Sequence, residues 1–312
     1  MSLSEKIKKL NKFLWNRDYR FLVLAGRGFM GDMPAEAFLK REYRILMHRE
    51  LDLENPVYYT EKLQWLKLYD HRPEYTVMVD KFAVKEYVAR KIGQEYVIPL
   101  LGVWERAEDI DFDALPESFV LKTTHDSGSY VVCKDKSKLD IPGARKRMAK
   151  FLKRKYYDCN REWPYKNVPP RIIAEAYMED SKHGELRDYK FFTFGGQPKV
   201  LYIAQGRGRG EATVADFFDM EFKHLPFTID HDIADTPPEK PEKFELMKEL
   251  AAKLSEGTPQ LRVDFYEVDG KVYFGEMTFF HCSGMEQFHP EEWNRTFGDW
   301  VILPPKRMEE SI

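Results

Sequence analysis

Apolar positions recur at helical spacing through much of the first half of the chain. The spacing predicts a helical stretch over residues 36–70, densest in NPVYYTEKLQWLKLYD, where Thr60 is the expected N-cap. A second helix is predicted over residues 80–92, because Gly93 is a good residue to end it. The next predicted elements are strands over 96–103, 118–124 and 130–134 and a basic helix over 142–156.

Alternation of apolar and polar residues, the pattern of strands, dominates the second half. The predicted elements are strands over 171–178, 188–194 and 199–205, a helix over 242–256 and a hairpin over 261–277. Residues 206–243 are rich in Gly, Pro and Asp, so we expect a long surface loop with short elements there. Helices and antiparallel hairpins that alternate in blocks predict an α+β fold.

Two registers are open to the last hairpin, which turns at Asp269-Gly270. A tight two-residue turn would set Asp264 opposite Gly275 and leave Glu276 on the other face. A three-residue loop sets Asp264 opposite Glu276, with Arg262 and Thr278 on the same face. We choose the second register because it separates polar from apolar side chains.

Paired carboxylates on this face have two interpretations. Two carboxylates side by side repel each other unless a positive charge lies between them. Mg²⁺ prefers such oxygen ligands, so Asp264 and Glu276 are candidate metal ligands. Alternatively, Arg262 neutralises the pair as an ion-pair cluster. The hairpin alone leaves both interpretations open.

A candidate phosphate site lies in FVLKTTHDSGSYVV. Lys122 ends an apolar strand there, and a small polar loop with Ser127, Gly128 and Ser129 follows. Such a loop can cover a polyphosphate with backbone N–H groups and hydroxyls, while the lysine supplies positive charge. It is not a Walker-type loop, because the GxxxxGK[ST] pattern is absent. Many ordinary hairpins have similar loops.

Four further charged residues are candidates for a site. Glu175 lies on an apolar strand in IIAEAYMED and needs a partner, either the amino group of adenine or a structural ion pair. Asp188 and Lys190 are two residues apart and therefore share a strand face. Lys81 begins a predicted helix, and a solvated lysine is its default interpretation.

Composition limits the classes of function. The chain has 312 residues, of which 43% are hydrophobic and 32% charged, as expected for a soluble protein of two or three lobes. A net charge of −3 does not favour nucleic acid as a partner. We expect neither a signal peptide nor a membrane-spanning segment, which needs about 20 apolar residues. Three widely spaced cysteines indicate a reducing cytoplasm.

Residues 4–20 combine an apolar stripe with a local excess of lysine. Ile7, Leu10 and Leu14 recur at helical spacing among Lys6, Lys8, Lys9 and Lys12. The favoured interpretation is a helix that packs its apolar stripe on the main domain. The alternative is a basic amphipathic helix on an anionic membrane surface, at the inner face of the membrane.

The order of these motifs resembles the ATP-grasp superfamily, and more narrowly the TupA-like ATP-grasp proteins, which are associated with teichuronopeptide and other bacterial cell-surface polymers. The resemblance covers roughly residues 35–303. It implies an ATP-grasp fold with the nucleotide between two α+β lobes and an N-terminal helical segment. The implied division is 1–74 for that segment, 75–180 for the N-terminal and central lobe, and 181–312 for the C-terminal lobe.

The resemblance also implies roles for single residues in binding ATP and Mg²⁺. Lys81, Lys122 and Lys190 would contact phosphates, and Asp188 shares the face of Lys190. Residues 127–129 would form the mobile cover. Glu175 would meet the adenine edge, with the backbone near Tyr177 and Met178 as the hinge.

At the metal hairpin the resemblance implies a catalytic centre. Asp264 and Glu276 would hold Mg²⁺, and Arg262 would act with Lys190 in catalysis by stabilising charge on the transferred phosphoryl group. Thr278 stands where the superfamily commonly has Asn, a better metal ligand than a hydroxyl. The number of Mg²⁺ ions, one or two, is therefore left open.

The implied activity is an ATP-dependent carboxylate–amine ligase that acts through an acyl phosphate. Its partners would be a carboxylated sugar or peptide acceptor and an amine donor, in bacterial cell-surface polysaccharide or teichuronopeptide-like polymer synthesis. A glycosyltransferase of such a pathway is one alternative, although no convincing DxD motif occurs. A non-catalytic nucleotide-binding partner is another. Roles for His125, His281, Arg207 and Arg209 are left open.

Overall fold

The computed structural model describes residues 3–182, 186–206 and 213–308, and Arg207 and Arg209 lie outside this part. The helices are α1 (Leu3–Trp15), α2 (Arg17–Ala25), α3 (Ala35–Met47), α4 (Tyr59–Tyr69), α5 (Pro73–Val79), α6 (Ala83–Lys91), α7 (Ile141–Phe151), α8 (Tyr156–Asn160), α9 (Phe244–Ser255) and α10 (Glu292–Trp300). The strands are β1 (Leu100–Trp104), β2 (Phe119–Thr123), β3 (Tyr130–Cys133), β4 (Ile172–Ala176), β5 (Asp188–Phe194), β6 (Gln197–Gln205), β7 (Val214–Phe218), β8 (His224–Leu225), β9 (Gln260–Val268) and β10 (Lys271–Thr278).

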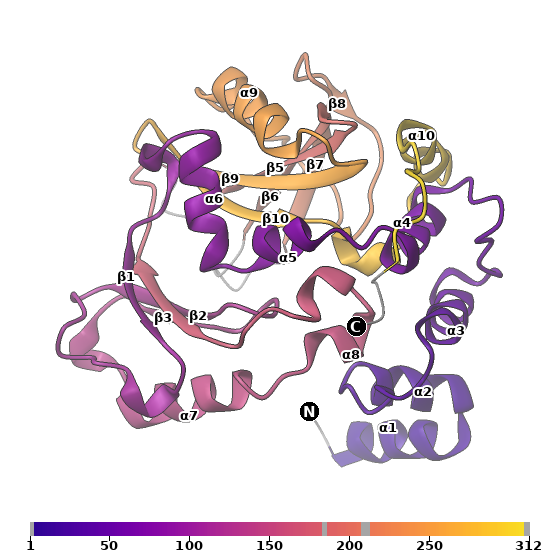
Figure 1. The fold of residues 1–312 in the computed structure, drawn as a ribbon, viewed down its shortest axis with the longest axis horizontal. Helices are drawn as coiled ribbons and strands as arrows, with labels where there is room; N and C mark the ends of the chain where they lie inside the picture. Colours follow the sequence, from indigo (N-terminus) through magenta and orange to yellow (C-terminus); the bar gives the residue numbers. More distant parts are fainter. Residues whose placement is uncertain (1–2, 183–185, 207–212, 309–312) are drawn as a thin grey trace.

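Two antiparallel sheets form the framework. The smaller sheet has the order β1-β4-β2-β3, and the larger has the order β10-β9-β5-β6-β7-β8. Helix α9 covers one face of the larger sheet, and α7 lies under the smaller one (Figure 1). The fold is α+β, as predicted.

Each sheet has its own hydrophobic core. The core of the smaller sheet contains Phe119 and Leu121 of β2 and Met148 of α7. The larger core also takes in apolar residues of α5 and α6, such as Tyr75 and Val88. These two helices therefore pack with the larger sheet, although they precede the smaller one in the chain.

Two predicted segments differ from the structure. The 36–70 stretch is two helices, α3 and α4, and α4 begins after Tyr58 rather than at a Thr60 cap. The side chain of Glu61 caps it by accepting from Tyr58 N–H at 3.0 Å. The expected surface loop over 206–243 contains β7, an inner strand of the larger sheet. The sequence pattern did not predict β7, because the apolar run around its buried Phe217 is short and lies between Gly- and Pro-rich segments.

The N-terminal helix does not pack its apolar stripe on the main domain, so the favoured interpretation was wrong. Ile7, Leu10 and Leu14 of α1 are each more than half exposed, and Trp15 is 84% exposed. Helix α1 contacts α2 and lies at the margin of the molecule (Figure 1). No helix among the described residues is long and apolar enough to cross a bilayer.

The last hairpin confirms the predicted pairing and corrects the reason for it. Its turn has two residues, Asp269 and Gly270, both with positive φ, so the predicted three-residue loop is wrong. A β-bulge at Gly275 shifts the register by one, and Glu276 thereby pairs with Asp264. A Cβ at Gly275 would lie 3.1 Å from the Asp264 carbonyl oxygen, so glycine suits the bulge.

Candidate active site

The face of the larger sheet opposite α9 carries the paired carboxylates. Phe191 contacts Phe244 of α9, so its neighbour Lys190 points to the opposite face. Lys190 pairs with Asp264 in the β5–β9 ladder, and Glu276 pairs with Asp264 from β10. Three adjacent strands thus bring these charged groups together.

Arg262 lies between the two carboxylates. Its Nε and Nη2 donate to Asp264 Oδ1 and Oδ2, both at 2.7 Å. Nη2 also lies 3.0 Å from Glu276 Oε1 and 3.0 Å from Thr278 Oγ1. The ion-pair cluster that was one of the two interpretations is therefore present in this structure.

Lys190 completes the pairing of Asp264. Its Nζ lies 2.5 Å from Asp264 Oδ2 and 3.3 Å from Asp188 Oδ1. Burial by itself would raise the pKa of Asp264, but Arg262 and Lys190 hold that pKa below its ordinary value. Asp264 is therefore a carboxylate at neutral pH.

The donor set suits Mg²⁺ in kind, since Asp264, Glu276 and Thr278 all offer oxygen. The Glu276 side chain is 40% exposed, and its Oε2 accepts no hydrogen bond from the described residues. Asp264 is fully buried, and both its oxygens are already paired. A cation here would take Glu276 first and share Asp264 with Arg262 and Lys190.

The smaller sheet contributes a second charged group. Glu175 of β4 is buried between Lys85 Nζ at 2.5 Å and Lys122 Nζ at 2.6 Å. Burial opposes its charge, but Lys122 and Lys85 lower the pKa of Glu175 to about 2. The sequence analysis missed Lys85, although DKFAVKEYV places it one helical turn after Lys81. The predicted contact of Glu175 with adenine stays a prediction.

The loop after β2 is anchored by a residue that the sequence analysis also missed. Asp126 is fully buried, and it accepts hydrogen bonds from Ser129 Oγ and, at 3.0 Å, from Arg154 Nη1. Ser127 and Gly128 are exposed, and Gly128 has a φ of +77° with open space where a Cβ would be. The loop therefore has a fixed base and an open tip.

Lys81 lies beside the same loop. Its Nζ donates to the backbone carbonyl of Asp126. Burial lowers the pKa of Lys81, against the opposing attraction of Glu276 and Asp126. Glu276 likewise helps to raise the pKa of Lys122 against the effect of burial. The charge of Glu276 therefore acts on the pKa of both Lys81 and Lys122.

The predicted hinge follows β4. Tyr177 and Met178 are half-buried, and Tyr177 donates from its hydroxyl to Glu179 at 3.1 Å. Nζ of Lys134, the residue after β3, lies 5.3 Å from the centre of the Tyr177 ring. The two residues join β4 of the smaller sheet to the segment that leads to β5 of the larger.

His281, at the start of the short helix η5 (His281–Gly284), is held by Arg262. Arg262 Nη1 donates to His281 Nδ1 at 2.7 Å. Burial and the charge of Arg262 lower the pKa of His281 to about 3. The ring is therefore neutral at pH 7, with its proton on Nε2, and it positions Arg262. His125 is also buried, and its Nε2 bonds the Arg154 carbonyl oxygen at 3.2 Å.

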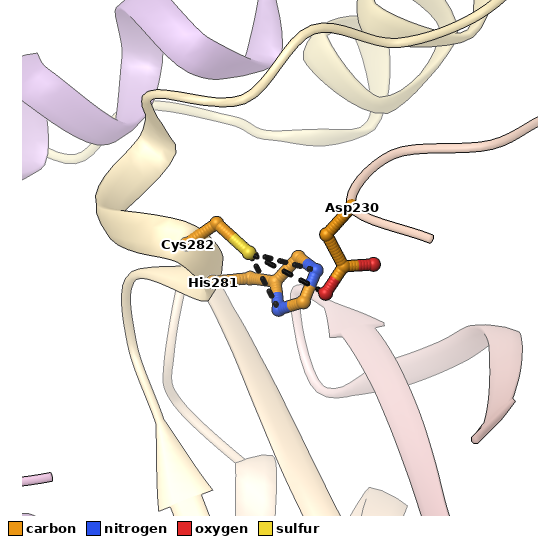
Figure 2. Close-up of side chains that lie close together, drawn as sticks. All are labelled: Asp230, His281 and Cys282. Carbon is orange, nitrogen blue, oxygen red and sulfur yellow. Dashed lines mark hydrogen bonds between the residues drawn. The ribbon is translucent and has the colours of Figure 1, made fainter. Parts of the chain in front are cut away.

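Asp230, His281 and Cys282 form a small cluster (Figure 2). Cys282 Sγ lies 3.6 Å from His281 Nε2 and 3.7 Å from Asp230 Oδ2. Burial and then Asp230 raise the pKa of the thiol. Because Arg262 occupies Nδ1 and Nε2 carries the proton, neither ring nitrogen is open to a metal ion in this arrangement.

Comparison with known proteins finds one matching family for the chain. The family model described as TupA-like ATPgrasp matches residues 61–302. No curated protein matches the chain.

Solved structures resemble the chain at low sequence identity. D-alanine–D-alanine ligase from Bacillus anthracis complexed with ATP is 15% identical with a TM-score of 0.41, over 65% of this chain and 55% of that one. D-cycloserine synthetase DcsG is 16% identical with a TM-score of 0.42, over 73% and 71%. An ATP-grasp RimK domain protein from Sphaerobacter thermophilus is 12% identical with a TM-score of 0.40, over 75% and 70%. The match spans little more than half of the Bacillus anthracis enzyme.

Proposed function

The chain belongs to the TupA-like ATP-grasp family, and on this premise we propose that it is an ATP- and Mg²⁺-dependent carboxylate–amine ligase. One observation carries the proposal: Lys190 and Arg262 meet the carboxylates of Asp264 and Glu276 on one face of the larger sheet. Two cations beside carboxylates of the kind that Mg²⁺ prefers suit the phosphates of ATP.

The reaction we propose has two steps. The substrate carboxylate attacks the γ-phosphorus of ATP, which releases ADP and leaves an acyl phosphate. The amine nitrogen then attacks the acyl carbon, so that a C–N bond forms, the C–O bond to phosphate breaks, and the amine loses a proton. No protein nucleophile is required, which agrees with the raised pKa of the Cys282 thiol.

The residues divide this work by position. Lys81, Lys122 and Lys190 bind phosphate oxygens, and the open tip at Ser127-Gly128 covers them. Arg262, held in place by His281, stabilises negative charge on the transferred phosphoryl group.

Glu276, Asp264 and Thr278 are the oxygen ligands for Mg²⁺ in this proposal. When bound, Mg²⁺ supplies positive charge to the phosphates. For the nucleotide itself, we place adenine near Glu175, with the Tyr177–Met178 segment as the hinge. Asp188 forms an ion pair with Lys190 at the base of the site.

The substrates we propose are a carboxylated sugar or peptide acceptor and an amine, in the synthesis of a bacterial cell-surface polymer. The exposed stripe of Ile7, Leu10 and Leu14 beside the lysines of α1 supports peripheral attachment to the inner face of an anionic membrane. Such attachment would hold the enzyme where surface polymers are assembled.

One assay series tests the function. The full chain is incubated with ATP, Mg²⁺, candidate sugar acids and amines, while ADP release and the mass of the acceptor are followed. We expect ADP release that requires both an acid and an amine. Binding of ATP without acceptor-dependent ADP release would indicate a non-catalytic nucleotide-binding protein. Turnover of UDP-sugars alone would indicate a glycosyltransferase.

A further inference from the structure

A cavity of about 420 Å³ lies beside the Asp230–His281–Cys282 cluster. Its polar lining includes Glu42, Asn160, Glu286, Gln287 and His289, and Cys282 forms part of its wall. None of the described residues that line it is a lysine or an arginine. The volume suits a small molecule rather than a polymer.

Glu42 of α3 is the unusual residue of this wall. Glu42 is only 8% exposed, and its Oε2 has no hydrogen-bond partner among the described residues. A buried carboxylate oxygen without a donor is costly, because it has lost its water without replacement. Burial accordingly raises the pKa of Glu42. A ligand that brings an N–H donor and a positive charge would remove this cost.

The two nearest cations do not fill that role. Lys67 donates to the Ser283 carbonyl oxygen at 2.8 Å and to the Asn160 carbonyl oxygen at 3.0 Å. Arg161 donates to backbone carbonyls, among them that of Asp158 at 2.7 Å. Both lower the pKa of Glu42 from a distance, and neither forms a hydrogen bond with it. Glu42 Oε2 is therefore buried without a donor among the described residues, and Glu42 is part of the cavity wall.

The other residues that line the cavity favour a positively charged ligand. Glu286 is a second carboxylate, and burial together with Asp230 raises its pKa. Two carboxylates and the side-chain amide of Gln287 match the three N–H donors of an ammonium group. The same wall repels a carboxylate, so the acid substrate does not belong in this cavity.

The cavity also reaches the reaction centre. Cys282 lines it and contacts His281 (Figure 2). His281 in turn accepts a hydrogen bond from Arg262. Cys282 and Ser283 both have positive φ, 47° and 55°, an unusual conformation for residues with side chains. Because of this tight turn, only the side chain of His281 separates Cys282 in the cavity wall from Arg262. In the proposed function Arg262 stabilises charge on the transferred phosphoryl group.

We propose that this cavity binds the amine substrate as an ammonium ion, with Glu42 as its anchoring carboxylate; the proposal rests on the ligase function proposed above. Before it attacks the acyl phosphate, an amine held here would pass the ammonium proton to a carboxylate of the cavity wall, Glu42 or Glu286, because the protonated nitrogen has no lone pair.

Direct binding tests the cavity without turnover. The whole chain is titrated by calorimetry with ethanolamine and putrescine, and with ethylene glycol as an uncharged control. In parallel, alkylation of Cys282 by N-ethylmaleimide is followed by peptide mass spectrometry. Cys159, which does not line the cavity, is the internal control. We expect one of the amines to bind and to slow alkylation of Cys282 at least fivefold, without effect on Cys159.

Variants locate the anchor. E42Q should weaken amine binding at least tenfold, whereas E36Q, an exposed position on the same helix, should leave it unchanged. If E42Q does not fold, E286Q is used in its place and should also weaken amine binding. Absence of amine binding to the wild type overturns the proposal, as does unchanged affinity in both E42Q and E286Q, or protection of Cys282 by acetate instead of amines.

The two proposals fail separately. Amine binding in the cavity without ADP release from any acid–amine pair would remove the ligase function and leave the cavity as an amine site. ADP release that depends on an amine which neither binds in calorimetry nor protects Cys282 would remove the cavity assignment and leave the ligase function.

Discussion

Arg262 Nη1 donates a 2.7 Å hydrogen bond to His281 Nδ1, while the rest of the guanidinium holds Asp264. The histidine accepts because its pKa, lowered to about 3 by burial and by Arg262, keeps the ring neutral. The arginine is therefore fixed from two sides. A cation that is already fixed beside the transferred group stabilises the charge on that group without first having to move.

Loss of the histidine acceptor should release Arg262. We expect H281A to lower kcat about 100-fold, because small misplacement of a catalytic group has effects of that order, with little change in KM for ATP. H281N retains an acceptor oxygen and should recover much of the rate. Steady-state kinetics of both variants decide this. Equal loss in H281A and H281N, or a rise in KM alone, would contradict a positioning role.

Glu276 should be essential for turnover and dispensable for folding. Its side chain is 40% exposed, so E276Q should leave the melting temperature nearly unchanged while it lowers ATP turnover at least 100-fold through loss of a metal ligand. The control is E267Q, on the same hairpin but outside the carboxylate pair. Unchanged turnover in E276Q across a Mg²⁺ titration would remove the metal assignment.

The bulge at Gly275 should matter more for Mg²⁺ than for stability. G275A places a Cβ 3.1 Å from the Asp264 carbonyl oxygen and from the Tyr266 ring, so the strand must move. We expect a loss of about 1–3 kcal/mol in the free energy of unfolding and a roughly tenfold higher Mg²⁺ requirement. Melting curves and Mg²⁺ titrations measure both quantities. G26A meets a comparable contact of 3.3 Å away from the site and should change neither turnover nor Mg²⁺ dependence.

Glu175 should contribute a stabilisation that depends on pH. Its pKa falls from the ordinary glutamate value of 4.5 to about 2 in the fold, so the folded state binds fewer protons between these values. The stabilisation is complete above about pH 4.5 and is lost as the pH falls through 2. E175Q should cost about 3 kcal/mol at pH 7, because Lys85 and Lys122 lose their buried partner.

The difference between wild type and E175Q should shrink as the pH falls from 4.5 toward 2. Urea unfolding at pH 7, 4 and 3 follows it. E179Q is the control, since Glu179 is exposed and its ion pair with Lys134 spans 3.5 Å. A constant difference over the whole range would show that the effect is steric rather than electrostatic.

The exposed stripe on α1 should bind anionic membranes. L10E should abolish sedimentation with vesicles that contain 40% phosphatidylglycerol, because it places a negative charge in a stripe that is otherwise apolar and flanked by lysines. I302E changes another residue that is 82% exposed, away from α1, and should bind as the wild type does. Failure of the wild type to sediment would leave the stripe without a membrane role.

The sequence by itself determined the family, the α+β class and the chemistry of the larger sheet's polar face. It did so because spacing along a strand decides which side chains share a face, and this rule groups Arg262 with Asp264 and Glu276 with Thr278. The match to the TupA-like family confirms the predicted ATP-grasp fold and the use of ATP with Mg²⁺ that goes with it. The lobe boundaries and the roles of single site residues stay predictions.

Only the tertiary structure decided which partners meet across distant segments. No local sequence pattern predicts the two-residue turn with a bulge at Gly275, the pairing of Lys85 with Glu175 or the unpartnered oxygen of Glu42. Each of these features depends on the packing of elements far apart in the chain. The same holds for α1, whose apolar stripe predicts a buried face on periodicity alone. Periodicity fixes which residues share a face, whereas the element that covers that face is set by the fold as a whole.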